Sequence, residues 1–230
     1  MRRGLLLLFP LALFLLPQEA AAEQSRVWAL VINNDTEEER HAKNLGQAVE
    51  ALSSRYGLRD HDLVSVGPGD RRAVGPSVGL PATGEGLGTA VAALSARGVH
   101  PDLLIVYMTG HGKDTPSGDF RYPLGHHQLT GQAIRALLHG VARPVRLIVI
   151  VDTCYSGLAT RALKGLSDNA TLVSSTGATV TSCKRFAHSL WHDLGDPNVS
   201  LEQAFDRAKL AHGHYLDKHP EWDPPDFTSE

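Results

Sequence analysis

The sequence contains few cysteines and little net charge. Only Cys154 and Cys183 occur among its 230 residues, which is too few for the disulfide framework that holds a small secreted scaffold together. A hydrophobic core must therefore stabilise the fold, and the chain is long enough for one domain with such a core. The formal net charge is −3, from 22 basic and 25 acidic residues. Because this balance gives no electrostatic footprint for nucleic acid, we expect no nucleic-acid partner.

No apolar run reaches the roughly 20 residues that a membrane-spanning helix needs, so we expect no stable membrane insertion. A shorter run over residues 5–16 follows a pair of arginines and precedes three alanines that end at Ala22. These are the three parts of a secretory signal peptide. We therefore expect residues 1–22 to be removed and residues 23–230 to form one secreted or periplasmic domain. Its last segment, 220–230, is predicted to be a loose tail or a short edge strand.

Strand patterns alternate with helix patterns along the chain. Short apolar runs predict five strands that are buried on both faces: residues 26–32, 61–67, 102–110, 145–153 and 170–175. Helical spacing of apolar residues predicts helices over residues 36–57, 87–98, 129–141 and 184–194, and one more from Ser200. Capping boxes mark two of the starts, Thr36 with Glu39 and Ser200 with Gln203. Residues 67–86, rich in glycine and proline, are predicted to form a loop.

This alternation predicts an α/β fold, a three-layer sandwich in which helices cover both faces of a mostly parallel sheet. A short right-handed crossover favours strands 102–110 and 145–153 as neighbours. Open sheets of this type bind ligands beyond the carboxyl ends of their strands. The candidate site residues are therefore those that follow the strands.

Reactive residues follow these two neighbouring strands. The first strand runs into His111-Gly112 and the second into Asp152-Thr153-Cys154. Neighbouring strands lie about 4.8 Å apart, so an imidazole and a thiol at adjacent strand ends can flank one substrate bond. A Cys154 thiolate would attack a carbonyl carbon while His111 moves the proton. The amides of Gly112 and Cys154 would donate hydrogen bonds to the oxyanion, which makes His111, Gly112 and Cys154 the candidate catalytic residues.

These motifs resemble those of a known enzyme family. An apolar strand ending in His-Gly, and one crossover later an apolar strand ending in acid-small-Cys-x-Ser-Gly, is similar to the caspase-fold cysteine peptidases. The likeness is closer to the legumain branch, which includes the transamidase that attaches glycosylphosphatidylinositol anchors. Asn34 and Arg40-His41 match residues of that branch, whereas Glu38 stands where the branch often has a second asparagine. The resemblance covers most of residues 26–213. It implies a caspase-like fold and a cysteine endopeptidase that acts on peptide or protein substrates and needs no metal or organic cofactor.

The resemblance also implies the residues of the primary substrate pocket. In the legumain branch an arginine after the first strand and an acid two residues before the nucleophile help line this pocket. Arg40 and Asp152 stand in the matching positions. A cation facing an anion suits a carboxamide side chain, which both accepts and donates hydrogen bonds. Asn34, Ser174 and Ser175 complete the predicted substrate-binding set, and we expect cleavage after Asn, with Asp second.

Other interpretations of the same residues remain open. Cys154 is also compatible with a buried structural thiol or with a disulfide to Cys183. An acyl-enzyme that is passed to an amine would make the protein a transpeptidase or transamidase. A catalytically silent caspase-fold module would instead bind a peptide or a protein. His188 and His192 lie four residues apart, but no carboxylate spacing completes a zinc site, so no metal is expected. Nothing in the sequence specifies an oligomeric state.

Overall fold

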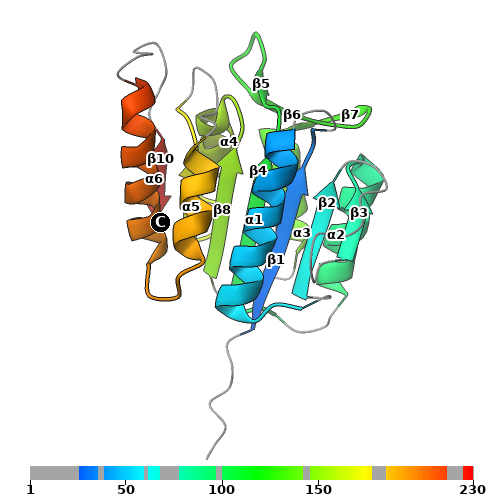
Figure 1. Ribbon diagram of the computed structural model, residues 1–230. Coiled ribbons are helices and arrows are strands. Elements are labelled where there is room, and N and C mark those ends of the chain that lie inside the picture. The colour runs from blue at the N-terminus through cyan, green and yellow to red at the C-terminus, as the bar shows by residue number, and fades with distance from the viewer. Residues whose placement is uncertain are drawn as a thin grey trace, which may run out of the picture.

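The structure, a computed structural model (Figure 1), describes residues 26–35, 39–59, 62–67, 78–96, 100–141, 146–177, 185–216 and 225–229. Its main element is a seven-stranded sheet in the order β10-β9-β8-β4-β1-β2-β3. Every strand in it is parallel to its neighbours except β10. The strands are β1 (Val27–Asn33), β2 (Leu63–Gly67), β3 (Val78–Pro81), β4 (Leu103–Thr109), β8 (Arg146–Asp152), β9 (Ala170–Ser174) and β10 (Asp226–Ser229). The predicted α/β class with a mostly parallel sheet is confirmed, and so is the pairing of β4 with β8.

Helices cover both faces of this sheet and complete three layers (Figure 1). One face carries α1 (Glu39–Tyr56), α5 (Phe186–Leu194) and α6 (Leu201–Leu216). The other face carries α2 (Gly84–Ser95), α3 (Gly131–Gly140) and α4 (Ser156–Leu163). Side chains that alternate along the central strands enter one core or the other, which is why these strands read as unbroken aliphatic runs. Within the described residues, none of the helices combines the length and the apolar character that crossing a bilayer requires.

The chain reverses its direction across the sheet between β1 and β4. α1 carries it from β1 to β2 over one face, whereas α3 and α4 carry it from β4 to β8 and then to β9 over the opposite face. Right-handed crossovers require opposite faces for opposite directions. The carboxyl ends of β1 and β4 therefore meet at the switch point of the sheet, the place where open α/β sheets bind ligands.

A small antiparallel sheet follows β4, and the sequence analysis did not predict it. It contains β5 (Lys113–Asp114), β6 (Phe120–Leu124) and β7 (His127–Thr130) in the order β5-β6-β7. The buried hydroxyl of Tyr122 donates a hydrogen bond to the Thr109 carbonyl oxygen at 2.7 Å, which anchors the small sheet at the end of β4. β7 extends to Thr130, whose side chain caps α3. The helix predicted to begin at residue 129 therefore begins two residues later.

One further prediction of local structure was wrong, and one helix was missed. The loop predicted over residues 67–86 contains the edge strand β3, which pairs with β2, and the first turn of α2, which Thr83 caps at 3.0 Å through the amide of Gly86. α4 was not predicted either. It has only eight residues, too few for a clear helical period, and its formation depends on packing against β6 and β9.

Several predicted boundaries are confirmed. Ser200 and Gln203 form the expected capping box, with reciprocal hydrogen bonds of 3.1 and 2.9 Å. α1 ends at the predicted stop, Gly57, whose φ of +65° suits a glycine after a helix. β10 is the edge strand that was one of the two alternatives for the tail. The signal peptide and Thr36 lie outside the described residues.

Candidate active site

The register of β4 and β8 brings the two predicted catalytic side chains to the same edge of the sheet. Thr109 pairs with Asp152 at the carboxyl end of this ladder, so His111 and Cys154 each follow two residues beyond it. A Cβ atom on Gly112 would overlap the carbonyl oxygen of Cys154. The His-Gly backbone and the Cys backbone are therefore in direct contact.

Asn34, which follows β1, holds the backbone of His111. Its side-chain oxygen accepts a hydrogen bond from the His111 amide at 2.7 Å, and its side-chain nitrogen donates to the His111 carbonyl at 2.8 Å. Gly110 permits this approach, because its φ is +116° and any Cβ there would overlap the Asn34 oxygen. The observed contacts of Asn34 are thus with the His111 loop, and its role in substrate binding stays a prediction.

Cys154 lies in a sharp turn between β8 and α4. Its thiol is free and partly exposed, which does not support a disulfide to Cys183, a residue outside the described ones. Tyr155 has a φ of +58°, a left-handed conformation that costs a non-glycine residue about 1–2 kcal/mol. Ser156 then fixes the start of α4, because its hydroxyl accepts from the Thr176 amide at 2.9 Å and contacts the Thr176 carbonyl at 3.1 Å.

Two backbone amides are available beside this thiol. Among the residues that the structure describes, neither the Gly112 amide nor the Cys154 amide donates a hydrogen bond. α4 begins two residues after Cys154, and the N-terminus of a helix favours negative charge nearby. The turn can therefore stabilise an oxyanion that forms next to the thiol.

Asp152 is buried at the centre of a polar cluster under α1. Its Oδ2 accepts hydrogen bonds from Asn44 at 3.3 Å and from the hydroxyls of Tyr107 and Thr109 at 3.2 Å each. Within the described part of the chain, its Oδ1 has no hydrogen-bond partner. Burial raises the pKa of Asp152, while neighbouring hydroxyls and the charge of Arg40 partly oppose this shift. One oxygen is thus satisfied by hydrogen bonds, and the other is buried without a hydrogen bond of ordinary geometry among the described residues.

The structure brings some of the predicted pocket residues to Asp152 and separates another. Arg40, in the first turn of α1, lies near enough for its charge to lower the pKa of Asp152. The pairing of Val151 with Ser174 places Ser175 on the Asp152 face of the sheet and Ser174 on the opposite face, because side chains alternate. Both serine hydroxyls are buried. The Ser174 hydroxyl has no hydrogen-bond partner among the described residues, whereas the Ser175 hydroxyl lies close enough to Asp152 to lower its pKa, although the two side chains miss ordinary hydrogen-bond geometry.

The polar cluster around Asp152 also contains Asp35 and His41, neither of which was predicted as a site residue. The Asp35 side chain is only 3% exposed, and its Oδ2 lies 3.5 Å from His111 Nε2 and 3.7 Å from His41 Nε2. His41 Nδ1 is hydrogen-bonded to Thr109 Oγ1 at 2.9 Å. The available signal was a run of three polar side chains, residues 33–35, at the carboxyl end of the buried strand β1, where the direction of the chain across the sheet reverses.

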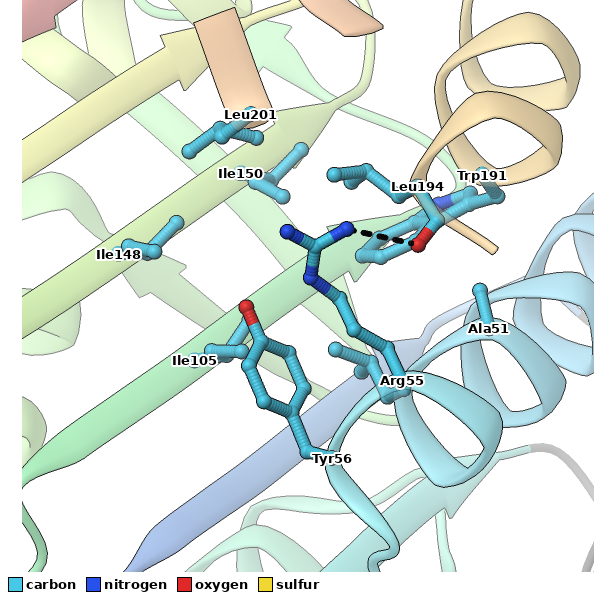
Figure 2. Close-up of a pocket in the computed structure, with 10 residues that line it drawn as sticks. Ala51, Arg55, Tyr56, Ile105, Ile148, Ile150, Trp191, Leu194 and Leu201 are labelled. Atoms are coloured by element: carbon cyan, nitrogen blue, oxygen red, sulfur yellow. Dashed lines mark hydrogen bonds between the residues drawn. The ribbon is translucent and has the colours of Figure 1, made fainter. Parts of the chain in front are cut away.

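An apolar cavity lies away from these groups. Figure 2 shows it between α1, α5 and the sheet, with Arg55 lying across it and donating to the Leu194 carbonyl at 3.3 Å. Ile105 and Ile148 line it from the early part of β4 and β8. Its volume of about 30 Å³ holds roughly two water molecules, so it does not accommodate a substrate side chain. The chemistry is concentrated at the other end of the sheet.

No family model matches the sequence, and no curated protein is significantly similar to it. The likeness to legumain therefore rests on its three short motifs, after β1, β4 and β8.

Proposed function

We propose that this protein is a cysteine endopeptidase with a caspase-like fold, in which Cys154 is the nucleophile and His111 the general acid and base. The observation that carries the proposal is the contact between Gly112 and the Cys154 carbonyl at the ends of two paired strands. A free thiol, an exposed imidazole and two available amides at one point are the groups that acyl transfer requires. Export through a cleaved signal peptide and membership of the legumain branch are part of this proposal.

The proposed reaction has two steps. The Cys154 thiolate attacks the carbonyl carbon of the peptide bond, its proton passes to His111, and the Gly112 and Cys154 amides stabilise the oxyanion. The carbon–nitrogen bond then breaks, His111 protonates the departing amine, and a thioester remains on Cys154. A water molecule that gives its proton to His111 attacks the thioester, which releases a carboxylic acid and restores the thiol.

The proposed primary pocket selects a carboxamide. Asp152 Oδ1, which has no hydrogen-bond partner in the described part of the chain, accepts from the substrate NH₂ group, and the Arg40 cation interacts with the substrate carbonyl oxygen. We expect cleavage after Asn first and after Asp second, with Asp increasingly accepted as pH falls and its carboxyl group is protonated. A peptide-library profile measures this preference. A profile dominated by Arg or Lys would show that Arg40 does not line the pocket.

A peptide with Asn before an electrophilic acyloxymethyl ketone tests the catalytic proposal. The probe should label the wild-type protein at Cys154 and should not label Cys154→Ala, which should also lose hydrolysis. His111→Ala should lower kcat/KM by roughly 100-fold or more. Cys183→Ala is the matched control and should label and cleave like the wild type. Hydrolysis retained in Cys154→Ala would refute the proposal.

The same experiment separates the alternatives. Labelling without hydrolysis, together with a new amide product when an amine is added, would indicate a transamidase. No labelling at all would favour a peptide-binding module. Sequencing the N-terminus of the exported protein tests the signal peptide, since the mature chain should begin at Glu23.

A further inference from the structure

Three consecutive polar residues at the carboxyl end of β1, Asn33, Asn34 and Asp35, form one hydrogen-bonded support around His111. Asn33 is fully buried, and its side chain binds the backbone of Asp35, accepting from the Asp35 amide at 2.9 Å and donating to the Asp35 carbonyl at 3.3 Å. Asn34 binds the backbone of His111 in the same two-way manner, at 2.7 and 2.8 Å. The backbone of Asp35 is thus fixed beside a His111 loop that is itself held, which places the buried Asp35 carboxylate near the His111 ring.

The Asp35 carboxylate faces two imidazoles, and the hydrogen bonds distinguish them. Arg40 Nε donates to His41 Nε2 at 3.1 Å, so this nitrogen carries a lone pair and no proton. The His41 proton then lies on Nδ1, where it reaches Thr109 Oγ1 at 2.9 Å, and the Thr109 hydroxyl donates in turn to Asp152. His41 therefore has no Nε2 proton to offer to Asp35. The imidazole that can donate to Asp35 through Nε2 is His111, at 3.5 Å.

We propose that Asp35 is the positioning residue of the active site: it accepts the Nε2 proton of His111 and so leaves Nδ1 as the nitrogen that exchanges a proton with Cys154 and with the departing amine. This inference rests on the proposed peptidase function. A buried carboxylate in this position has two effects on an imidazole. It selects one tautomer and one ring orientation, and it stabilises the imidazolium that forms when the thiol is deprotonated.

The position of His111 makes this support necessary. Its side chain is 50% exposed, whereas that of Asp35 is 3% exposed. An exposed imidazole that is held only through its backbone samples several rotamers and both tautomers. Asp35 supplies an acceptor 3.5 Å from Nε2 that can restrict the ring.

Nitrogen-15 NMR of histidine-labelled protein tests the inference directly, because the ring shifts report which nitrogen carries the proton. In the wild type at a pH where His111 is neutral, the Nε2–H tautomer should dominate. In Asp35→Ala it should fall to a mixture, and kcat should decrease by about 100-fold or more with KM changed by less than about threefold. Asp35→Asn keeps the shape and one acceptor, so its kcat should lie between the two.

Asp168→Ala, which removes an exposed carboxylate from the turn before β9, is the matched control and should leave the tautomer and kcat unchanged. If Asp35→Ala does not fold, Asp35→Asn alone decides the question. A His111 tautomer and a kcat that are unchanged in a folded Asp35 variant would overturn the inference. The tautomer is measured without substrate, so it judges the role of Asp35 even if the wild type cleaves nothing and the peptidase proposal fails.

Discussion

Replacing Gly112 by alanine should damage both stability and catalysis, because a Cβ at this position has no space. It would overlap the Cys154 carbonyl oxygen and would also lie 2.7 Å from Thr153 Oγ1 and 2.9 Å from a ring carbon of Phe120. Two of these three obstacles belong to the turn that carries Cys154 and the third to a buried ring, so none can move at little cost in free energy. Overpacking of this kind costs about 1–3 kcal/mol of unfolding free energy.

The effect on catalysis should exceed the effect on folding. The turn must shift to admit the methyl group, and a shift displaces the Gly112 amide from the oxyanion, where the loss of one donor lowers kcat by roughly 100- to 1,000-fold. Urea unfolding and steady-state hydrolysis of a fluorogenic peptide measure the two effects. Gly88→Ala is the matched control: nothing lies within 4 Å of its Cβ on α2, so it should stabilise the protein by about 0.5–1 kcal/mol and leave kcat unchanged. A Gly112→Ala variant with wild-type stability and activity would refute the contact between the two strand ends.

Three further predictions concern single side chains. Burial raises the pKa of Asp152 above its ordinary 3.8, so the folded protein binds a proton there more tightly than the unfolded chain does. The wild type should therefore lose stability relative to Asp152→Asn as pH rises above that value; urea unfolding at several pH values measures this difference, and a difference that does not change with pH would contradict the prediction. Tyr155→Val should lower the unfolding free energy by about 1–2 kcal/mol more than Tyr155→Asn, because a β-branched residue tolerates a positive φ poorly and asparagine tolerates it well; equal thermal midpoints for the two variants would argue against the left-handed turn. Arg55→Met removes hydrogen bonds to three carbonyl oxygens, at the end of α5 and in the loop that leads to α6, and should lower the unfolding free energy by about 1–3 kcal/mol. It should not change kcat/KM, because Arg55 lies at the far end of the sheet from Cys154; a lower kcat/KM at full stability would contradict that separation.

The long buried strands were predictable from the sequence, whereas the short exposed ones were not. β1, β4 and β8 are continuous aliphatic runs, and such runs have few alternatives to a central parallel strand. β3 reads VGLP, a loop-like sequence that becomes a strand only because β2 offers an edge to pair with. β6 buries alternate residues as a strand should, but a proline interrupts its pattern and its partners are four residues long or shorter.

The candidate site was predictable to the extent that it depends on strand ends. The partnership of His111 with Cys154 follows from two neighbouring strands and needs no knowledge of side-chain positions. The contacts of Asn34 and Asp35 with His111 do not follow, because they depend on how the turn after β1 folds back over the end of β4. Ser174 shows the same limit, since a shift of one residue in a strand decides which face a side chain occupies.

The proposed nucleophile and base are attached to β4 and β8, strands with a neighbour on each side in the middle of the seven-stranded sheet. Backbone amides in such strands exchange with solvent only when the whole domain opens, whereas edge strands such as β3 and β10 open locally at much lower cost in free energy. Local opening at either edge of the sheet should therefore leave the spacing of His111 and Cys154 intact, so that the proposed catalytic geometry persists until the domain unfolds as a unit.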